Sequence, residues 1–131
     1  MSEENVEIVS RMYEAVRRGD AELALSYIDP KVVTDARHRV DGRIGHGRDE
    51  LMAILAEWLS TWDDWNQEIE QIRDLGDRVL VIETQRGRGK GSGIEWKGRF
   101  GMLFELKGGK ITRWTVYDDL PKALEAAGVS E

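Results

Sequence analysis

The 131-residue sequence predicts a single α+β domain in which helices cover one face of a twisted antiparallel sheet. Two observations carry this prediction. Apolar residues recur at helical spacing in the first half of the chain, and the period changes from 3.6 to 2 after Asp63 and Asp64. Short turns that contain glycine then separate the predicted strands, and strands joined by short turns pair antiparallel. The expected order of elements is α-α-β-α-β-β-β-β-α.

Three helices are predicted before the change of period. The first begins near Ser2 and ends at Arg17-Arg18-Gly19, where cations and a glycine form a stop signal. The second follows Asp20, which is expected to cap it, and ends at Asp29-Pro30. The third opens at Gly47. Its apolar stripe consists of Leu51, Ile54, Leu55, Trp58, Leu59 and Trp62.

The strands are expected mainly in the second half of the chain. One short strand, residues 31–36, comes earlier and is followed by a loop rich in glycine and arginine. Four longer strands are predicted at about 65–74, 78–88, 93–106 and 111–118. A last helix ends at Gly128, with Asp119 as its predicted N-cap and Pro121 in its first turn.

Composition argues against several classes of protein. The net charge of −6 repels phosphate backbones, so no nucleic-acid partner is expected. The absence of cysteine rules out disulfides, a thiol nucleophile and a thiolate metal site. The polar, acidic start argues against a secretory leader, and no apolar run approaches the ~20 residues that a membrane helix needs. We therefore expect a cytoplasmic protein with no membrane partner.

Strand alternation predicts which residues share a face of the sheet. The rows expected to face the helices are Leu80, Ile82, Thr84, Arg86 and Arg88; Trp96, Phe100, Met102, Phe104 and Leu106; and Trp114, Val116 and Asp118. Arg86, Arg88 and Asp118 end otherwise apolar rows, and a buried charge needs a partner or a polar cavity. We therefore predict a cleft that is apolar in its depth and charged toward one end. The opposite face is mixed in character and suits a partner subunit.

The order of elements and four segments resemble the SnoaL-like branch of the nuclear transport factor 2-like superfamily, which includes ketosteroid isomerase. The segments are YEAVRRGDAELALSYIDP, DELMAILAEWL, GKITRWTVYDD and KALEAAG, and the likeness covers nearly the whole chain. The resemblance implies a cone, in which a curved antiparallel sheet wraps around three helices and an apolar pocket, followed by a short C-terminal helix. It also implies a homodimer through the outer sheet face. The superfamily holds both enzymes and non-catalytic binding proteins, so the fold does not settle the function.

Two enzymes of the superfamily are poorly matched at their catalytic positions. The base of ketosteroid isomerase aligns with Asp35, but its two oxyanion donors fall on Met12 and Met102, and each such donor is typically worth ~10²–10³ in rate. Limonene-epoxide hydrolase uses an Asp-Arg-Asp trio, and this sequence has a counterpart only for the arginine, at Arg86. Neither reaction is therefore expected.

Five residues are candidates for acid–base chemistry, and each has a structural alternative. Asp118 is either a general base with a pKa raised by an apolar wall or a rim acid that is solvated or paired with an arginine. Asp35 faces the same choice. Tyr13 is a proton donor or a core residue with a satisfied hydroxyl. His38 and His46 flank the loop over the cone mouth and are either acid–base groups or simply exposed.

The predicted ligand site lies inside the cone. Its members are Arg86, Trp58, Trp62, Trp96, Phe100, Met102, Trp114 and Val116. The tryptophans are expected to be mainly core residues, of which one or two line a pocket for a flat molecule. The leading hypothesis is a pocket protein that catalyses proton transfer, of isomerase or cyclase type, on a small apolar or aromatic carbonyl compound, with Arg86 holding an oxygen of the ligand. The other hypothesis is a non-catalytic ligand-binding or dimerisation module. The histidines and acids lack the spacing of a metal site, and no cofactor is expected.

Overall fold

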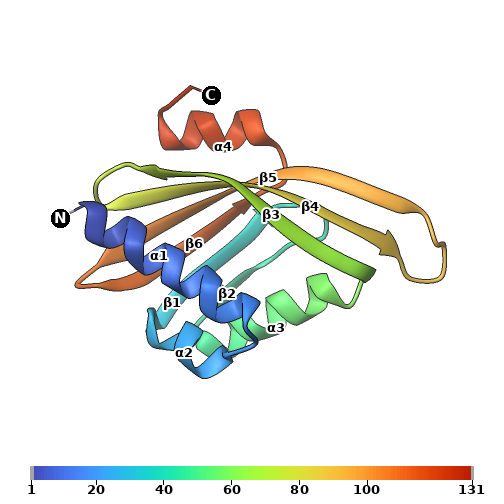
Figure 1. Cartoon of the computed structure of the whole chain (residues 1–131), viewed down its shortest axis with the longest axis horizontal. Helices are drawn as coiled ribbons and strands as arrows, with labels where there is room; N and C mark the ends of the chain where they lie inside the picture. The colour runs from blue at the N-terminus through green and yellow to red at the C-terminus, as the bar shows by residue number, and fades with distance from the viewer. Residues whose placement is uncertain (1, 131) are drawn as a thin grey trace.

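The computed structural model describes residues 2–130, which form one curved, open six-stranded sheet and four helices (Figure 1). The elements are α1 (Ser2–Arg17), α2 (Ala21–Ser26), β1 (Ile28–His38), β2 (Ile44–His46), α3 (Arg48–Leu59), β3 (Trp62–Asp74), β4 (Arg78–Gly89), β5 (Glu95–Lys107), β6 (Lys110–Tyr117) and α4 (Leu120–Ala127). The predicted α+β class, the cone around the N-terminal helices and the short C-terminal helix are confirmed.

The sheet is mixed and not wholly antiparallel as expected. Its strand order is β2-β1-β6-β5-β4-β3, and the four strands from β3 to β6 pair antiparallel through short connections. β1 instead runs parallel to β6, with Thr34 opposite Trp114. These two strands are far apart in sequence and are not joined by a turn, so the rule that short turns give antiparallel pairs does not apply to them.

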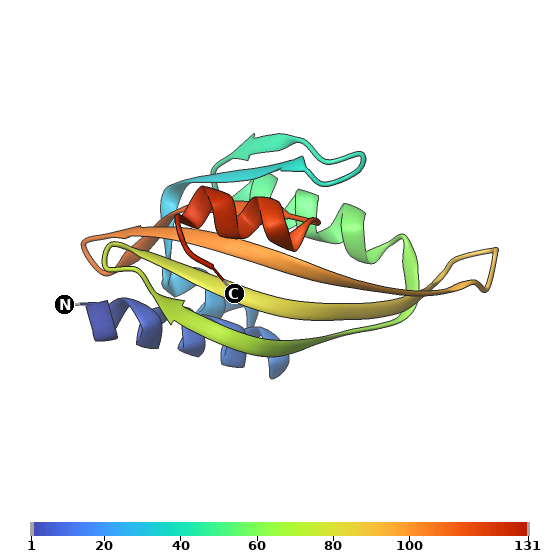
Figure 2. The same ribbon diagram turned by 90° about the horizontal axis from the view of Figure 1, so that it is seen from above.

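Helices lie on both sides of the sheet (Figures 1 and 2). α1, α2 and α3 pack in the concave side around the larger apolar core, whereas α4 covers a second core on the outer face. The contact of α4 with β5 is very close, because a Cβ atom added to Gly101 would lie 2.2 Å from the Cβ of Ala123. The expectation that all helices share one face therefore fails for α4.

The orientation predicted for β4 is wrong. Val79 and Val81 belong to the core under α1–α3, whereas Leu80 and Ile82 pack beneath α4. By strand alternation, Glu83 follows Val79 and Val81 into the concave side, and Arg86 and Arg88 fall on the row of Leu80 and Ile82. Both rows of the strand begin with apolar residues because helices cover both faces of the sheet, so alternation could not tell them apart.

Most local signals at helix ends are confirmed, but the end predicted for α2 at Asp29-Pro30 is wrong, because α2 ends at Ser26 and Asp29-Pro30 lies in β1. α1 ends at Arg17, and Asp20 caps α2 by accepting a hydrogen bond from the backbone N–H of Leu23. Oδ1 of Asp119 accepts a hydrogen bond of 3.4 Å from the N–H of Lys122 and so caps α4, which ends at Gly128 with φ of +75°. Within residues 2–130, no helix is long and apolar enough to cross a membrane.

Other boundaries also differ from the sequence prediction. α3 ends at Leu59, so Trp62 begins β3 and does not extend the helical stripe. The segment that was expected to be a loop after residue 36 contains the end of β1 and the short strand β2, which pairs with β1 through Asp35 and Ile44.

Candidate functional site

A cavity of about 320 Å³ lies between the concave face of the sheet and helices α1–α3; we call it the inner cavity. Its walls are mainly apolar and include Met12, Tyr13, Leu51, Leu55, Trp58, Met102, Trp114 and Val116. Val16, Met52 and Leu59 also line it and are exposed at the surface of α1 and α3. The cavity therefore reaches solvent between these two helices, through an apolar opening.

Glu83 is the only acid among the described residues that line the inner cavity. The residue is 1% exposed, and Oε2 makes no hydrogen bond to any group in residues 2–130. Burial disfavours the charged carboxylate and raises the pKa of Glu83 from 4.5 to about 7, while the neighbouring polar groups of Gln85 and Tyr13 moderate the rise. Glu83 can thus both accept and release a proton near neutral pH.

Tyr13 brings a hydroxyl group from α1 to the same cavity. This hydroxyl is buried beside the Glu83 carboxyl and interacts with it, although no hydrogen bond of normal geometry joins it to any group in the described residues. Burial, followed by the negative charge of Glu83, raises the pKa of Tyr13 well above 10.0. The phenol therefore stays neutral and keeps its proton, which makes it a hydrogen-bond donor to a ligand oxygen.

Gln85 is held in one orientation by two tryptophans. Its Oε1 accepts hydrogen bonds from Nε1 of Trp58 at 2.8 Å and from Nε1 of Trp65 at 3.2 Å. The amide oxygen is thereby used, so the group that Gln85 can offer to Glu83 or to a ligand is its NH₂ donor. This arrangement ties α3, β3 and β4 together along one side of the inner cavity.

A second, outer cavity of about 640 Å³ adjoins the first at Arg39 and Trp58, which line both. The guanidinium of Arg39 lies 4.4 Å from the centre of the Trp58 ring, a cation–π distance. Burial lowers the pKa of Arg39, and the charges of Asp118 and Glu57 partly offset this effect. The aromatic wall of the outer cavity includes Trp62 and Trp96, which stack with ring centres 4.5 Å apart.

The structure places the predicted base Asp118 at the exposed margin of the outer cavity. Its Oδ2 accepts a hydrogen bond of 3.1 Å from the backbone N–H of Val40. Asp118 does not line the inner cavity, and its side chain is exposed to solvent. The hypothesis that an apolar wall surrounds Asp118 and raises its pKa is therefore not supported.

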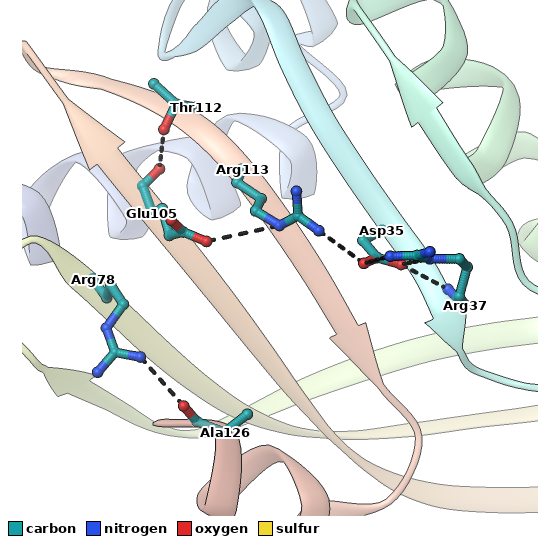
Figure 3. A network of polar contacts seen from close by, with 7 residues as sticks. All are labelled: Asp35, Arg37, Arg78, Glu105, Thr112, Arg113 and Ala126. Carbon is teal, nitrogen blue, oxygen red and sulfur yellow. Dashed lines mark hydrogen bonds and ion pairs between the residues drawn. The ribbon is translucent and has the colours of Figure 1, made fainter. Parts of the chain in front are cut away.

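Asp35 lies on the outer face of the sheet, in an ion-pair network with two arginines (Figure 3). It is 2% exposed, and Oδ2 lies 2.9 Å from Nη2 of both Arg37 and Arg113. The hydrogen bonds from Arg37, together with the charge of Arg113, lower the pKa of Asp35 to about 2. This carboxylate faces away from both cavities and holds a proton only weakly, which favours a structural role.

The two histidines and Arg86 also lie away from the inner cavity. His38 is exposed and stacks on Tyr117 with ring centres 4.6 Å apart, and His46 is exposed on β2. Arg86 is exposed near the β4–β5 hairpin. Among the described residues there is no group of three or more acids or histidines placed to hold a metal ion.

The other residues predicted to bind a ligand do lie on cavity walls. Trp58, Met102, Trp114 and Val116 line the inner cavity, and Trp58, Trp62, Trp96 and Phe100 line the outer one. Sequence reasoning missed Glu83, Gln85 and Arg39. The available signal was the acid within the run VLVIETQ, residues 79–85, because a carboxylate inside an otherwise apolar strand must have a special environment.

Comparison with known proteins places the chain in a family. Residues 9–114 match the model of the SnoaL-like domain, so the chain belongs to the SnoaL-like family. A comparison with curated proteins found no match.

Solved structures share the fold at low sequence identity. A protein from Jannaschia sp. CCS1, provisionally named a SnoaL-like polyketide cyclase, has a TM-score of 0.78 at 19% identity, covering 99% of this chain and 95% of its own. TerC, co-crystallised with polyporic acid, has a TM-score of 0.77 at 22% identity, covering 95% and 98%. A ketosteroid isomerase-like protein from Catenulispora acidiphila DSM 44928, in complex with trimethylamine, has a TM-score of 0.72 at 18% identity, covering 95% and 94%.

Proposed function

We propose that this protein binds a small, mainly apolar carbonyl compound in the inner cavity and catalyses proton transfer at the carbon next to the carbonyl group. The observation that carries the proposal is Glu83, a single buried carboxyl group that faces an apolar cavity with Oε2 unpartnered. A base that titrates near neutral pH is well matched to abstracting a proton from carbon.

The proposed reaction uses two side chains of the chain and no other reagent. The Glu83 carboxylate removes a proton from the α-carbon, and the electron pair of the broken C–H bond moves to the carbonyl oxygen to form an enolate. The Tyr13 hydroxyl donates a hydrogen bond to this oxygen, where negative charge develops. Glu83 then returns the proton to the same carbon or to a conjugated one, which completes an exchange or an isomerisation.

Proteins of the same fold support the binding of a small molecule. One relative of the same fold carries polyporic acid, another carries trimethylamine, and a third is provisionally named a polyketide cyclase. The same cavity also suits a non-catalytic binding protein, in which the aromatic walls hold a ligand that undergoes no change.

The test uses 2-tetralone, an aryl-fused ketone with exchangeable α-protons. Binding is followed by tryptophan fluorescence, and exchange of the α-protons in D₂O is followed by NMR. We expect the wild-type protein to bind 2-tetralone and to accelerate exchange. Glu83→Gln should still bind 2-tetralone, but its exchange rate should be lower by a factor of about 10²–10⁴. Asp118→Asn serves as the matched comparison, because it removes the carboxylate at the rim while leaving Glu83 in place.

Each outcome decides between the candidates. If exchange persists in Glu83→Gln but disappears in Asp118→Asn, Asp118 is the catalytic base. Binding without any exchange favours the non-catalytic binding module. A wild-type protein that does not bind 2-tetralone contradicts the assignment of the inner cavity as the ligand site.

We also propose that the protein is cytoplasmic and forms a homodimer through the outer sheet face. α4 covers part of the outer sheet face, so a dimer contact must use the remaining part, which carries the polar group of Glu70, Thr84 and Arg99. Sedimentation of the wild-type protein over a range of concentrations tests the dimer directly.

A further inference from the structure

Arg39 is the charged residue through which the inner and outer cavities meet. The side chain is half-buried, and its buried Nε has no hydrogen-bond partner in residues 2–130. The face of its guanidinium is occupied by the Trp58 ring at 4.4 Å. No salt bridge engages its terminal N–H groups in the described part of the chain, which leaves the edge of the guanidinium free for an acceptor.

The other charged groups of the outer cavity are less able to select a ligand. Arg43 and Glu57 are exposed and pair with each other at 2.8 Å, and Asp118 is exposed and accepts a hydrogen bond from the N–H of Val40. Asp41 and Lys97 also line this cavity, and both are exposed. Exposed charges are screened by water and salt, whereas a half-buried charge acts through a less polarisable medium. Arg39 therefore contributes the strongest local charge at the junction, and that charge is positive.

The shape of the surroundings defines the rest of the ligand. Beyond Arg39 the inner cavity is walled by rings, among them Trp58, Trp65 and Trp114. Rings of this kind bind flat, apolar molecules well. A guanidinium presents parallel N–H groups that match the two oxygens of a carboxylate.

We infer that the ligand is a flat aromatic compound with one anionic oxygen group, whose ring fills the inner cavity and whose anionic group is bound by Arg39. This inference rests on the proposed function for the use of the inner cavity as the ligand site. Beyond the proposed function, the inference specifies the charge of the ligand and its orientation. The anionic end lies at the junction of the two cavities, and the ring points toward Tyr13 and Glu83.

The test compares three probes that share one ring system and differ in charge: 2-naphthoate, methyl 2-naphthoate and (2-naphthylmethyl)trimethylammonium. Calorimetry measures the affinity of each for the wild-type protein, Arg39→Met and Arg43→Met. Arg43→Met is the matched control, because it removes the same charge from the outer cavity without touching the inner one. We expect the wild type to bind 2-naphthoate at least about tenfold more tightly than the ester, a difference of ~1.4 kcal/mol.

The two variants show whether the preference for the acid depends on Arg39 or on the positive charge of the outer cavity in general. Arg39→Met should bind the acid and the ester equally, with its affinity for the ester within about twofold of wild type, whereas Arg43→Met should keep the preference for the acid. Three results in the wild-type protein would overturn the inference: equal affinities for the acid and the ester, tighter binding of the ammonium compound, or no binding of any probe. These results do not depend on whether Arg39→Met folds. Tighter binding of the ammonium compound would assign selection to Glu57 and Asp118.

The inference and the proposed reaction can fail separately. A tenfold preference for 2-naphthoate that survives in Glu83→Gln supports the role of Arg39, whatever the exchange experiment shows. Conversely, Glu83-dependent exchange of 2-tetralone without a preference for the anionic probe retains the reaction and removes the proposed charge of the ligand.

Discussion

Tyr13 of α1 and Glu83 of β4 reach one apolar cavity from the helical wall and the sheet wall, and neither the hydroxyl of Tyr13 nor Oε2 of Glu83 has a hydrogen-bond partner within residues 2–130. A buried polar group without a partner typically costs ~1–3 kcal/mol of stability. Two such groups side by side are unusual in a folded core and indicate a site prepared for a ligand.

Tyr13→Phe should separate function from stability. The hydroxyl makes no hydrogen bond of normal geometry in the described residues, but it interacts with the Glu83 carboxyl and moderates its pKa. Urea unfolding should therefore show a free energy within about 1 kcal/mol of that of wild type. The rate of 2-tetralone exchange should fall by about 10²-fold, because the developing enolate loses its donor. A destabilised variant with unchanged exchange would contradict the assigned role of the hydroxyl.

The pKa of Glu83 should make the protein less stable as the pH rises. In the folded protein Glu83 keeps its proton up to about pH 7, but in the unfolded chain it loses the proton near pH 4.5. The folded state therefore binds more protons between these values, so the free energy of unfolding contributed by this group falls as pH rises through the interval. The fall amounts to about 3 kcal/mol.

Urea unfolding at pH 5 and pH 8 measures this effect. Glu83→Gln cannot ionise, so the drop in stability between the two pH values should be smaller in this variant than in wild type by about 2.5 kcal/mol, because part of the fall has already occurred by pH 5. Identical pH dependence in the two proteins would show that Glu83 does not titrate in this range.

Asp35 should affect stability with the opposite dependence on pH. Its pKa is lowered from 3.8 to about 2 by Arg37 and Arg113, so its contribution is fully present above about pH 4 and is lost as the pH falls through about 2. Asp35→Asn should cost about 1–2 kcal/mol at pH 7, because solvent around the exposed Arg37 screens part of the pair, and it should leave ligand binding unchanged.

The control for Asp35 is an exposed ion pair. Glu7→Gln removes the i, i+4 pair of Glu7 with Arg11 on the surface of α1 and should change stability little. Urea unfolding at pH 7 and pH 2.5 compares the two variants with wild type. Loss of α-proton exchange in Asp35→Asn would restore Asp35 as a catalytic candidate.

Gly101→Ala should loosen the attachment of α4 to the sheet. The added Cβ would lie 2.2 Å from the Cβ of Ala123, so the helix must move or the strand must bend. We expect a loss of about 1–3 kcal/mol on urea unfolding. The double variant Gly101→Ala, Ala123→Gly removes the clash and should be more stable than Gly101→Ala alone; a double variant that is no more stable would exclude this contact as the cause.

The sequence predicted what local signals control. The caps at Asp20 and Asp119 and the stop at Arg17-Arg18-Gly19 depend on residues a few positions apart, and they were placed correctly. The inward rows of β5 and β6 were also correct for the apolar residues from Phe100 to Leu106 and for Trp114 and Val116. Each of these rows has a polar or small-residue row opposite it over most of its length, so alternation gives a clear answer.

The facing of β4 and the surroundings of Asp35 required the tertiary structure. Residues 79–85 are buried on both faces because α4 lies outside and α1 inside, so both rows of β4 begin with apolar residues and the sequence put Glu83 on the wrong side. Asp35 acquires its partner Arg113 from a strand 78 residues further along the chain. A single sequence contains no local signal for that contact.

The most direct test of the account is the titration of the Glu83 carboxyl group by ¹³C NMR, with Glu83→Gln used to assign the resonance. Proton transfer by Glu83 at neutral pH is most efficient when its carboxyl group is buried and titrates in that range. The account predicts a pKa of about 7 for Glu83. A pKa near the ordinary value of 4.5 would show that the carboxylate is solvated, and it would contradict both the burial of Glu83 in the inner cavity and its assignment as the base.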